Sequence, residues 1–444
     1  MLHPSALFET MKVICDKGAD FIYTDEATFE SPELHKIIHT NFKPDFAPDY
    51  FHGCNYICHF TSFKRTLLES SGGAFNSECD GSQDYDLFLR LTEHAQKICH
   101  IAKCLYFWRS SSSSVAEGTG AKPYTMKAEK HALENHFKRC GQEAEIDFAK
   151  VNNTYRVKYK IKEKPLVSII IPSYDHWKTL KRCIDSIETL STYKNYEIII
   201  IENNSKLKKI FDYYKSLESD EKEKVVTWPG RFNYAAINNF GFAYARGGII
   251  LLNNDTQVIT PGWIEEMLMF AQRKDVGAVG AMLYFPSGKI QHAGVILGLH
   301  GLAGHACYKA FKDTICYCYR NVLAMNCSAV TAACMMMSRT VYEQVKGFDE
   351  SLKVDFNDVD LCMRIRKAGY LIVWTPFAEL YHSESESCGQ KDTLEKVKRS
   401  QIETEIFKER WKKELLAGDP YYNPNLSVSF DDFSTKDGAV FPVL

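Results

Sequence analysis

The chain has 444 residues, enough to bury at least two hydrophobic cores. Hydrophobic residues make up 45% of it and charged residues 25%, which is ordinary for soluble globular proteins. With a formal net charge of −2 it offers no basic surface for nucleic acid, and no apolar run approaches the length of a membrane span.

The 15 cysteines predict neither a disulfide framework nor a zinc site, because no Cys-x-x-Cys pair occurs and many cysteines stand inside apolar runs. Residues 1–30 do not resemble a signal peptide. We therefore expect reduced thiols in a cytoplasmic protein.

A long internal similarity is the first feature in chain order. Residues 73–96 read GAFNSECDGSQDYDLFLRLTEHAQ, and residues 347–370 read GFDESLKVDFNDVDLCMRIRKAGY. Both contain Asp-x-Asp-Leu followed by an arginine three residues after the leucine, and the segments before them, HFTSFKRTLLES and CMMMSRTVYEQ, also agree. A period this long is no solenoid repeat, so it predicts a duplicated domain.

Two connecting segments follow the first copy. Residues 121–141 carry apolar side chains among charges and predict an amphipathic helix. Residues 154–165 form a lysine-rich connection, with lysines that alternate along an expected strand. We expect the domain boundary near residues 150–165.

Three apolar strands are predicted next, at residues 167–171, 197–201 and 247–252, with a helix at residues 179–190. Strands that are apolar throughout and alternate with helices predict a parallel sheet covered on both faces. Each strand ends in a polar cluster, and ligands bind at the carboxyl ends of such strands. These clusters are residues 173–175, 202–205 and 253–255.

Five motifs in this order resemble family 2 glycosyltransferases, and more narrowly the bacterial surface-polysaccharide branch of rhamnosyl- or O-antigen transferases. They are VSIIIPSYDHWKTLKRCIDSI, YEIIIIENNSK, FNYAAINNFGFAYARGGIILLNNDT, VTAACMMMSRTVYEQVKGFDE and FNDVDLCMRIRKAGY. The resemblance implies an α/β glycosyltransferase A (Rossmann-like) fold in the C-terminal domain. It also implies a nucleotide-sugar donor, a divalent cation (Mg²⁺ or Mn²⁺) and inversion at the anomeric carbon.

The same resemblance implies a nucleotide pocket at the strand ends. Glu202 would accept a hydrogen bond from an imide N–H of the base. For Asn233, which resembles a donor-contacting residue, helix capping is an equally good interpretation. The residues expected to bind the nucleotide are Pro172, Tyr174, Asp175, Glu202, Asn239 and Asn254.

For the reaction itself, the resemblance implies Asp255 and His382 as metal ligands and Asp358 as catalytic base. An asparagine stands at the first position of the family's Asp-x-Asp, but one carboxylate is enough when the diphosphate supplies further ligands. Asp360 has a second interpretation, a pair with Arg364 one helical turn later. Residues expected near the donor sugar or acceptor are His292, His305, Asn357 and Asp360, with Gln291 in the same loop.

The first copy is expected to be inactive. Asp84 stands where Asp358 stands, but Phe107 replaces the histidine, and the strands of a nucleotide pocket are present only in the second copy. We therefore predict an incomplete, inactive copy at residues 1–115, a helix and linker at 116–165, a complete domain at 166–415, and a C-terminal tail at 416–444.

The leading hypothesis is an inverting, metal-dependent glycosyltransferase that acts on a saccharide or lipid-linked acceptor in cell-surface polysaccharide synthesis. The competing hypothesis is a non-catalytic carbohydrate- or nucleotide-binding scaffold derived from such an enzyme. A nucleotidyltransferase is a weaker alternative, because the Gly-rich phosphate loop after the first strand is absent. We expect the protein in the cytoplasm. Contact with the inner face of the plasma membrane and an oligomer that covers the half-domain are two open alternatives.

Overall fold

The computed structural model describes residues 1–30, 37–110, 123–217, 222–383 and 393–436. The expected boundary at residues 115/116 and the end of the tail lie outside them.

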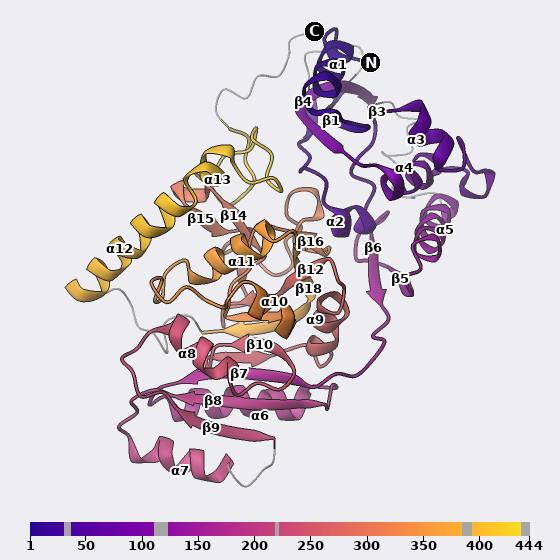
Figure 1. Cartoon of the computed structure of the whole chain (residues 1–444). Helices are drawn as coiled ribbons and strands as arrows, with labels where there is room; N and C mark the ends of the chain where they lie inside the picture. Colours follow the sequence, from indigo (N-terminus) through magenta and orange to yellow (C-terminus); the bar gives the residue numbers. More distant parts are fainter. Residues whose placement is uncertain (31–36, 111–122, 218–221, 384–392, 437–444) are drawn as a thin grey trace.

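A ten-stranded mixed sheet forms the centre of the C-terminal part (Figure 1). Its main path runs β11-β18-β12-β17-β10-β7-β8-β9, while β13 pairs with β12 and β16 with β18. The strands are β7 (Val167–Ser173), β8 (Tyr196–Glu202), β9 (Glu223–Thr227), β10 (Gly248–Leu252), β11 (Thr256–Val258), β12 (Val276–Tyr284), β13 (Ile290–His292), β16 (Met325–Asn326), β17 (Cys334–Met337) and β18 (Leu371–His382).

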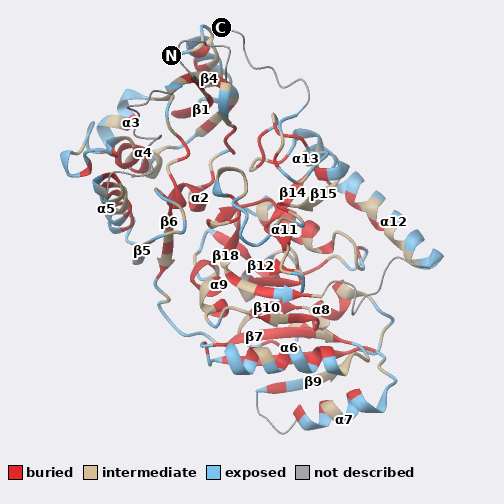
Figure 2. Ribbon diagram, turned by 180° about the vertical axis from the view of Figure 1, so that it is seen from behind, coloured by how far each residue is buried: buried red, intermediate tan, exposed pale blue. Residues whose placement is uncertain are grey.

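The predicted parallel sheet is confirmed for the strands that the sequence singled out. β10, β7, β8 and β9 are parallel neighbours. Every residue of β8 is buried, and Figure 2 shows β7 and β10 largely buried as well. The second half of the sheet is mixed, because β17 runs antiparallel to both β10 and β12 while β12 and β18 are parallel.

Helices cover this sheet on both sides. The helix α6 (Trp177–Leu190) confirms the predicted segment. On α8 (Tyr234–Phe242), a Cβ at Gly241 would lie 2.6 Å from Ile170 and 3.0 Å from Ile201, so the missing side chain lets this helix lie close to β7 and β8. The remaining helices of this part are α7 (Lys208–Leu217), α9 (Trp263–Ala271), α10 (Arg339–Gln344), α11 (Asn357–Lys367), α12 (Leu394–Arg410) and α13 (Lys412–Ala417).

The N-terminal part has a smaller sheet of four strands. Its central strand β1 (Phe21–Glu30) is parallel to β4 (Ile98–Ser110) and antiparallel to β2 (Ile37–Asn41) and β3 (Thr61–Phe63). Its helices are α1 (Ala6–Lys17), α2 (Pro48–Gly53), α3 (Arg65–Ser70) and α4 (Gln83–His94).

The two sheets repeat one arrangement. In both, a central strand has a parallel neighbour on one side and an antiparallel strand on the other: β4 and β3 beside β1, and β18 and β17 beside β12. A short antiparallel strand, β2 or β13, pairs with the end of each central strand. The sequence similarity thus coincides with a similarity of strand pairing.

Matching ion pairs support this correspondence. Arg90 Nε lies 2.9 Å from Asp86 Oδ2, and Arg364 Nε lies 2.8 Å from Asp360 Oδ2. One turn of helix separates the partners in both cases, and the arginine also donates to a backbone carbonyl after α3 or α10.

The predicted linker helix is observed as α5 (Pro123–Arg139). The lysine-rich connection begins with β6 (Tyr155–Tyr159), which pairs with the preceding strand β5 (Ala144–Phe148) as a hairpin. The N-terminal part packs directly on the C-terminal part. Asn326 Oδ1 accepts from Asp49 N at 2.8 Å, and Asn423 Nδ2 donates to Asp25 Oδ2 at 2.8 Å. The second contact also shows that the tail folds back onto the first sheet. A hairpin β14 (Val295–Leu297) and β15 (Ala303–His305) completes the strands.

In the part of the chain that the structure describes, no helix has the length and apolar character needed to cross a membrane.

Candidate active site

The polar ends of the parallel strands meet at one edge of the large sheet, as predicted. Ser173 and Glu202 are register partners at the ends of β7 and β8. The end of β10 lies beside them, because β10 pairs with β7 in parallel register. The loops after these strands form the candidate nucleotide pocket.

Asp175 and Glu202 hold the loop after β8 in place. Asp175 Oδ1 accepts from the backbone N–H groups of Lys206 and Leu207 at 2.7 and 2.8 Å, and Glu202 Oε1 accepts from Ser205 N at 2.6 Å. Glu202 is 4% exposed, whereas the Tyr174 side chain is 43% exposed, a position from which it can stack on a base. Pro172 is half-buried within β7.

Asn239 lies in a different environment from the one expected for a donor-contacting residue. Its Nδ2 donates to Phe348 O and to Glu350 Oε1, both at 3.0 Å, while Oδ1 accepts from Tyr342 OH and Phe348 N. Both the nitrogen and the oxygen of the amide are thus used in hydrogen bonds that join α8 to α10 and the segment after it. Asn233 caps α8, accepting from Ala236 N at 3.1 Å, as its alternative interpretation predicted.

Asp255 and His382 come together at the end of the sheet. β11 pairs antiparallel with β18 so that Thr256 is the register partner of His382. This pairing puts His382 Nε2 3.2 Å from Asp255 Oδ1. Both residues are buried, as is Asn254 between β10 and Asp255.

The hydrogen bonds of His382 indicate its tautomer. Gln291 Oε1 lies 2.7 Å from Nδ1, so Nδ1 carries the proton that this acceptor needs. Nε2 has two neighbours, Asn253 Nδ2 and Asp255 Oδ1, each at 3.2 Å. In the tautomer with its proton on Nδ1, the ring offers a nitrogen ligand beside a carboxylate oxygen, a donor set that divalent cations accept. The residues present fit a divalent cation.

Asp358 lies in the first turn of α11, and backbone N–H groups hold its carboxylate. Oδ2 accepts from Ala332 N at 3.1 Å, and Oδ1 accepts from Val359 N at 2.8 Å. The Tyr234 hydroxyl lies 3.0 Å from Asn253 Oδ1 and 3.1 Å from Ala332 O. Tyr234 thus connects the loop of Asp255 to the loop that holds Asp358.

Asp360 is corrected from an expected sugar-contacting residue to a core residue. Its side chain is fully buried, and Oδ2 pairs with Arg364. Arg410 Nη1 and Trp411 Nε1 donate to Oδ1 at 2.8 and 2.9 Å. This carboxylate is used entirely inside the protein and cannot contact a substrate. Asn357 is 3% exposed and donates to Val354 O at 3.0 Å, so it holds the turn before α11.

His292 and His305 form a pair beside His382. Their Nδ1 atoms are 2.8 Å apart, and Thr331 N donates to His292 Nε2 at 3.4 Å. Burial, with His305 and His382 close by, holds the pKa of His292 well below its usual range. A neutral His292 that accepts at Nε2 carries its proton on Nδ1 and donates it to His305. Because His292 is fully buried, its expected contact with sugar or acceptor is corrected to orienting the half-buried His305.

The positions of the first copy that correspond to the site differ in chemistry. Asp84 Oδ1 accepts from Tyr85 N at 2.9 Å, as Asp358 accepts from Val359. Phe107 stands at the position of His382, is 2% exposed, and pairs through its backbone with Met1. An apolar ring offers no metal ligand there.

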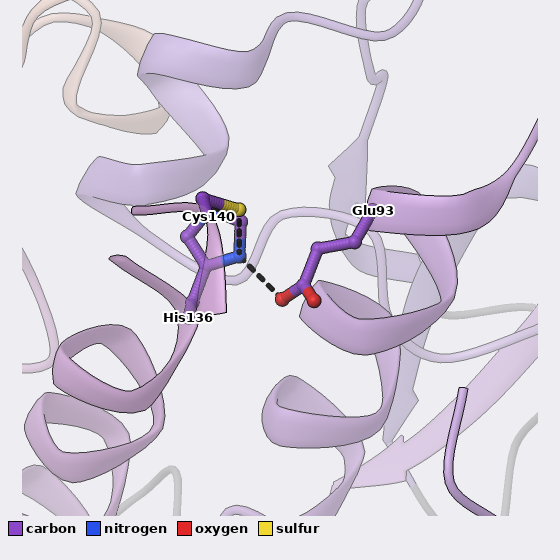
Figure 3. Close-up of side chains that lie close together, drawn as sticks. All are labelled: Glu93, His136 and Cys140. Atoms are coloured by element: carbon purple, nitrogen blue, oxygen red, sulfur yellow. Dashed lines mark hydrogen bonds and ion pairs between the residues drawn. The ribbon is translucent and has the colours of Figure 1, made fainter. Parts of the chain in front are cut away.

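One further group of metal-ligating residue types lies where α4 meets α5 (Figure 3). His136 Nδ1 lies 2.7 Å from Glu93 Oε1, and Cys140 Sγ lies 3.9 Å from the same nitrogen. Arg139 donates to both carboxylate oxygens of Glu93, which already balances its charge. This group is therefore best explained as an ion-pair network that joins the two helices, and sequence spacing had not indicated it.

Comparison with known proteins gives one family and several relatives. The profile of the family described as Glycosyl transferase family 2 matches residues 168–345. Uncharacterized protein y4gI of Sinorhizobium fredii is 42% identical over 440 residues, which are 98% of this chain and 48% of that protein.

Two named relatives are O-antigen biosynthesis protein RfbC of Myxococcus xanthus and N-acetylglucosaminyl-diphospho-decaprenol L-rhamnosyltransferase of Mycobacterium tuberculosis. The first is 35% identical over 436 residues, 97% of this chain and 33% of RfbC. The second is 30% identical over 151 residues, 32% of this chain and 48% of that enzyme. The chain thus spans half or less of the length of these proteins. Residues 168–345 are thus similar to proteins of glycosyltransferase family 2, and the rest of the chain is similar to parts of longer relatives.

Proposed function

We propose that residues 166–415 are an inverting, metal-dependent glycosyltransferase with a glycosyltransferase A fold. It transfers a sugar from a nucleotide-sugar donor to a saccharide or lipid-linked acceptor in the synthesis of a cell-surface polysaccharide. The family 2 match supports glycosyl transfer, and the names of RfbC and the mycobacterial rhamnosyltransferase support the acceptor class. The proposal is carried by the Asp255–His382 pair and by the Tyr234 hydroxyl, which connects the loop of Asp255 to the backbone that holds Asp358.

The donor nucleotide binds over the ends of β7 and β8. Tyr174 stacks on the base, and the Pro172–Asp175 turn and Glu202 line its edge, while Asn254 lies toward the diphosphate. The exposure of Tyr174 and the burial of Glu202 support this division. Asn239 is left out of the pocket, because its amide is already used.

Asp255 and His382 would hold the divalent cation, Mg²⁺ or Mn²⁺. When bound there, it would neutralise negative charge on the nucleoside diphosphate that leaves. The closeness of His382 Nε2 to Asp255 Oδ1, with Gln291 Oε1 at the other ring nitrogen, supports this assignment.

Asp358 is the base. The acceptor hydroxyl oxygen forms a bond to the anomeric carbon, the bond from that carbon to the diphosphate oxygen breaks, and the hydroxyl proton moves to Asp358. Attack from the face opposite the leaving group inverts the anomeric configuration. The backbone N–H groups of Ala332 and Val359 fix the carboxylate without neutralising it. His305, which His292 holds through the contact between their Nδ1 atoms, donates a hydrogen bond to the sugar or acceptor.

Residues 1–115 are an incomplete and inactive copy of the same domain, residues 116–165 connect the two, and residues 416–444 form a tail. The repeated strand pairing and the matched pairs Asp86–Arg90 and Asp360–Arg364 support this division. The protein acts in the cytoplasm at the inner face of the membrane, where lipid-linked acceptors are found.

A non-catalytic scaffold is the second candidate, and a nucleotide-sugar screen separates the two. Thermal shift against UDP, GDP, dTDP and their sugars, with Mn²⁺ or Mg²⁺ and then with chelator, identifies the donor. Slow donor hydrolysis with the stabilising nucleotide sugar supports the enzyme. Stabilisation without any hydrolysis or transfer favours the scaffold, and no stabilisation by any nucleotide contradicts both donor-binding accounts.

A further inference from the structure

We infer that β3, α3 and the Gly73–Phe75 turn form a docking surface for a second Rossmann-like half-domain of the kind that residues 167–252 form. This inference rests on the proposed duplication. The surface, called the β3–α3 face below, lies in Figure 1 at the end of the molecule opposite β7–β9.

The strand edge carries the first part of the argument. In the complete copy, β17 pairs with β12 on one side and with β10 on the other, in four antiparallel register pairs from Ile249↔Met337 to Leu252↔Cys334. In the first copy, β3 pairs with β1, and within the described ranges it has no second strand partner. A strand edge left open in this way is suited to pair with another strand.

The arginine that begins the next helix carries the second part. Arg339 pairs with Glu343, donates to Ala245 O at 2.5 Å and lies over the Phe242 ring at 4.5 Å. Arg65 makes the same pair with Glu69, but its side chain is 90% exposed, against 38% for Arg339. The helix end that covers Arg339 has no counterpart over Arg65 among the described residues.

The glycine turn after α3 is also open where the corresponding turn after α10 is covered. A Cβ at Gly347 would lie 2.5 Å from Asn239 Oδ1 on α8, whereas a Cβ at Gly73 would meet nothing within 4 Å. The neighbouring Phe75 is 68% exposed, while Phe348 is 3% exposed and lies against Tyr234 of α8. Phe75 is thus exposed where its counterpart is covered by α8.

These three comparisons determine what kind of partner fits. It supplies a strand equivalent to β10, antiparallel to β3, and a helix equivalent to α8 that covers Arg65 and Phe75. We assign it to a polypeptide segment outside residues 1–444. The chain spans 48% and 33% of the length of two of its relatives. A second copy of this chain is less suited, because its own β10 is already paired with β17.

A direct fusion tests the inference. Met1 N donates to Phe107 O at 2.6 Å, and Phe107 N donates to Met1 O at 2.8 Å. In the complete copy, Thr256 is the register partner of His382. Residues 160–255 are therefore placed directly before Met1 of the full chain, so that Asp255 precedes Met1 as it precedes Thr256. We expect amide hydrogen exchange at residues 60–64 to slow at least tenfold relative to the unfused chain.

Two single variants sharpen the result. Phe75→Ser should leave the unfused chain unchanged and reduce the protection in the fusion. Phe430→Ser, at a phenylalanine that is 60% exposed in the tail, is the matched control and should change neither. Protection of residues 60–64 in the unfused chain that increases with protein concentration would identify a second copy as the partner and overturn the inference.

A fused segment that folds without protecting residues 60–64, or that stays unfolded, would also overturn it. Hydrogen exchange at this face does not involve nucleotide binding at residues 166–415. Failure of the proposed transferase activity would therefore leave this test intact, and failure here would leave the transferase intact.

Discussion

His382 Nε2 lies 3.2 Å from Asp255 Oδ1, although the two residues are far apart in sequence, because Thr256 and His382 are register partners across β11 and β18. One strand pairing therefore fixes both donor atoms relative to each other. The same pairing in the first copy brings Met1 to Phe107, where no ligand is available.

The first prediction concerns this pair. Asp255→Ala and His382→Ala should each weaken the binding of the nucleoside diphosphate in Mn²⁺ or Mg²⁺ and leave its weaker binding in chelator unchanged, since both residues act through the cation. Calorimetry in both buffers measures this. The matched control is Asp212→Ala, at an exposed acid on α7. An equal loss in chelator would mean that the residues contact the nucleotide or hold the fold.

The second prediction separates the two copies of the motif. Asp84 and Asp358 accept the same backbone hydrogen bond from the next residue, but only Asp358 lies beside a candidate donor site. Asp84→Asn should leave transfer unchanged, and a titration should give one nucleotide per chain. Two nucleotide sites, or a large loss of activity in Asp84→Asn, would contradict the inactive-copy assignment.

The third prediction concerns Asp360, which is fully buried between Arg364 and Arg410. Asp360→Ala should lower the free energy of unfolding by roughly 2–4 kcal/mol, because it removes the buried carboxylate that Arg364, Arg410 and Trp411 share. Both arginines are partly exposed, and Arg410 keeps its pair with Asp349. Asp86→Ala should have a smaller effect, since Asp86 pairs with Arg90 alone among the described ion pairs. Urea unfolding measures both. An Asp360→Ala variant with unchanged stability and impaired turnover would show that Asp360 belongs to the active site.

The fourth prediction concerns pH. Burial, with nearby positive groups, holds the pKa values of His52 and His292 well below 6.5 in the folded protein. Below about pH 6.5 the unfolded chain takes up these protons and the folded protein does not, so stability falls as the pH falls. Each histidine contributes up to about 1.4 kcal/mol per pH unit. His52→Gln and His292→Gln should each flatten the dependence of urea midpoints between pH 7 and pH 5, and an unchanged slope would show that these histidines are charged in the fold.

The sequence predicted the features that depend on local pattern. Buried β-branched runs with polar ends indicated β7, β8 and β10 and the edge at which Glu202 and Asp255 lie. The internal similarity indicated two related sheets, and the alternative interpretation of Asp360 as a partner of Arg364 is confirmed.

What the sequence did not indicate depends on contacts between distant segments. The antiparallel strand β17 between β10 and β12 is set by tertiary packing. The role of Asn239 follows from the closeness of α8 to the turn after α10, more than a hundred residues later. Tyr234 was missed as a connecting residue, because no spacing rule relates it to Asn253 and Ala332.

The most direct test of the central claim is the turnover of the identified nucleotide-sugar donor by the wild-type chain and by Asp358→Asn at saturating donor. The account predicts a rate lower by roughly 10²–10⁴ in the variant, the usual contribution of a general base, with unchanged donor affinity and an unchanged unfolding midpoint. The control Asp84→Asn should keep the wild-type rate. A near-normal rate in Asp358→Asn, or no turnover of any nucleotide sugar by the wild-type chain, would contradict it.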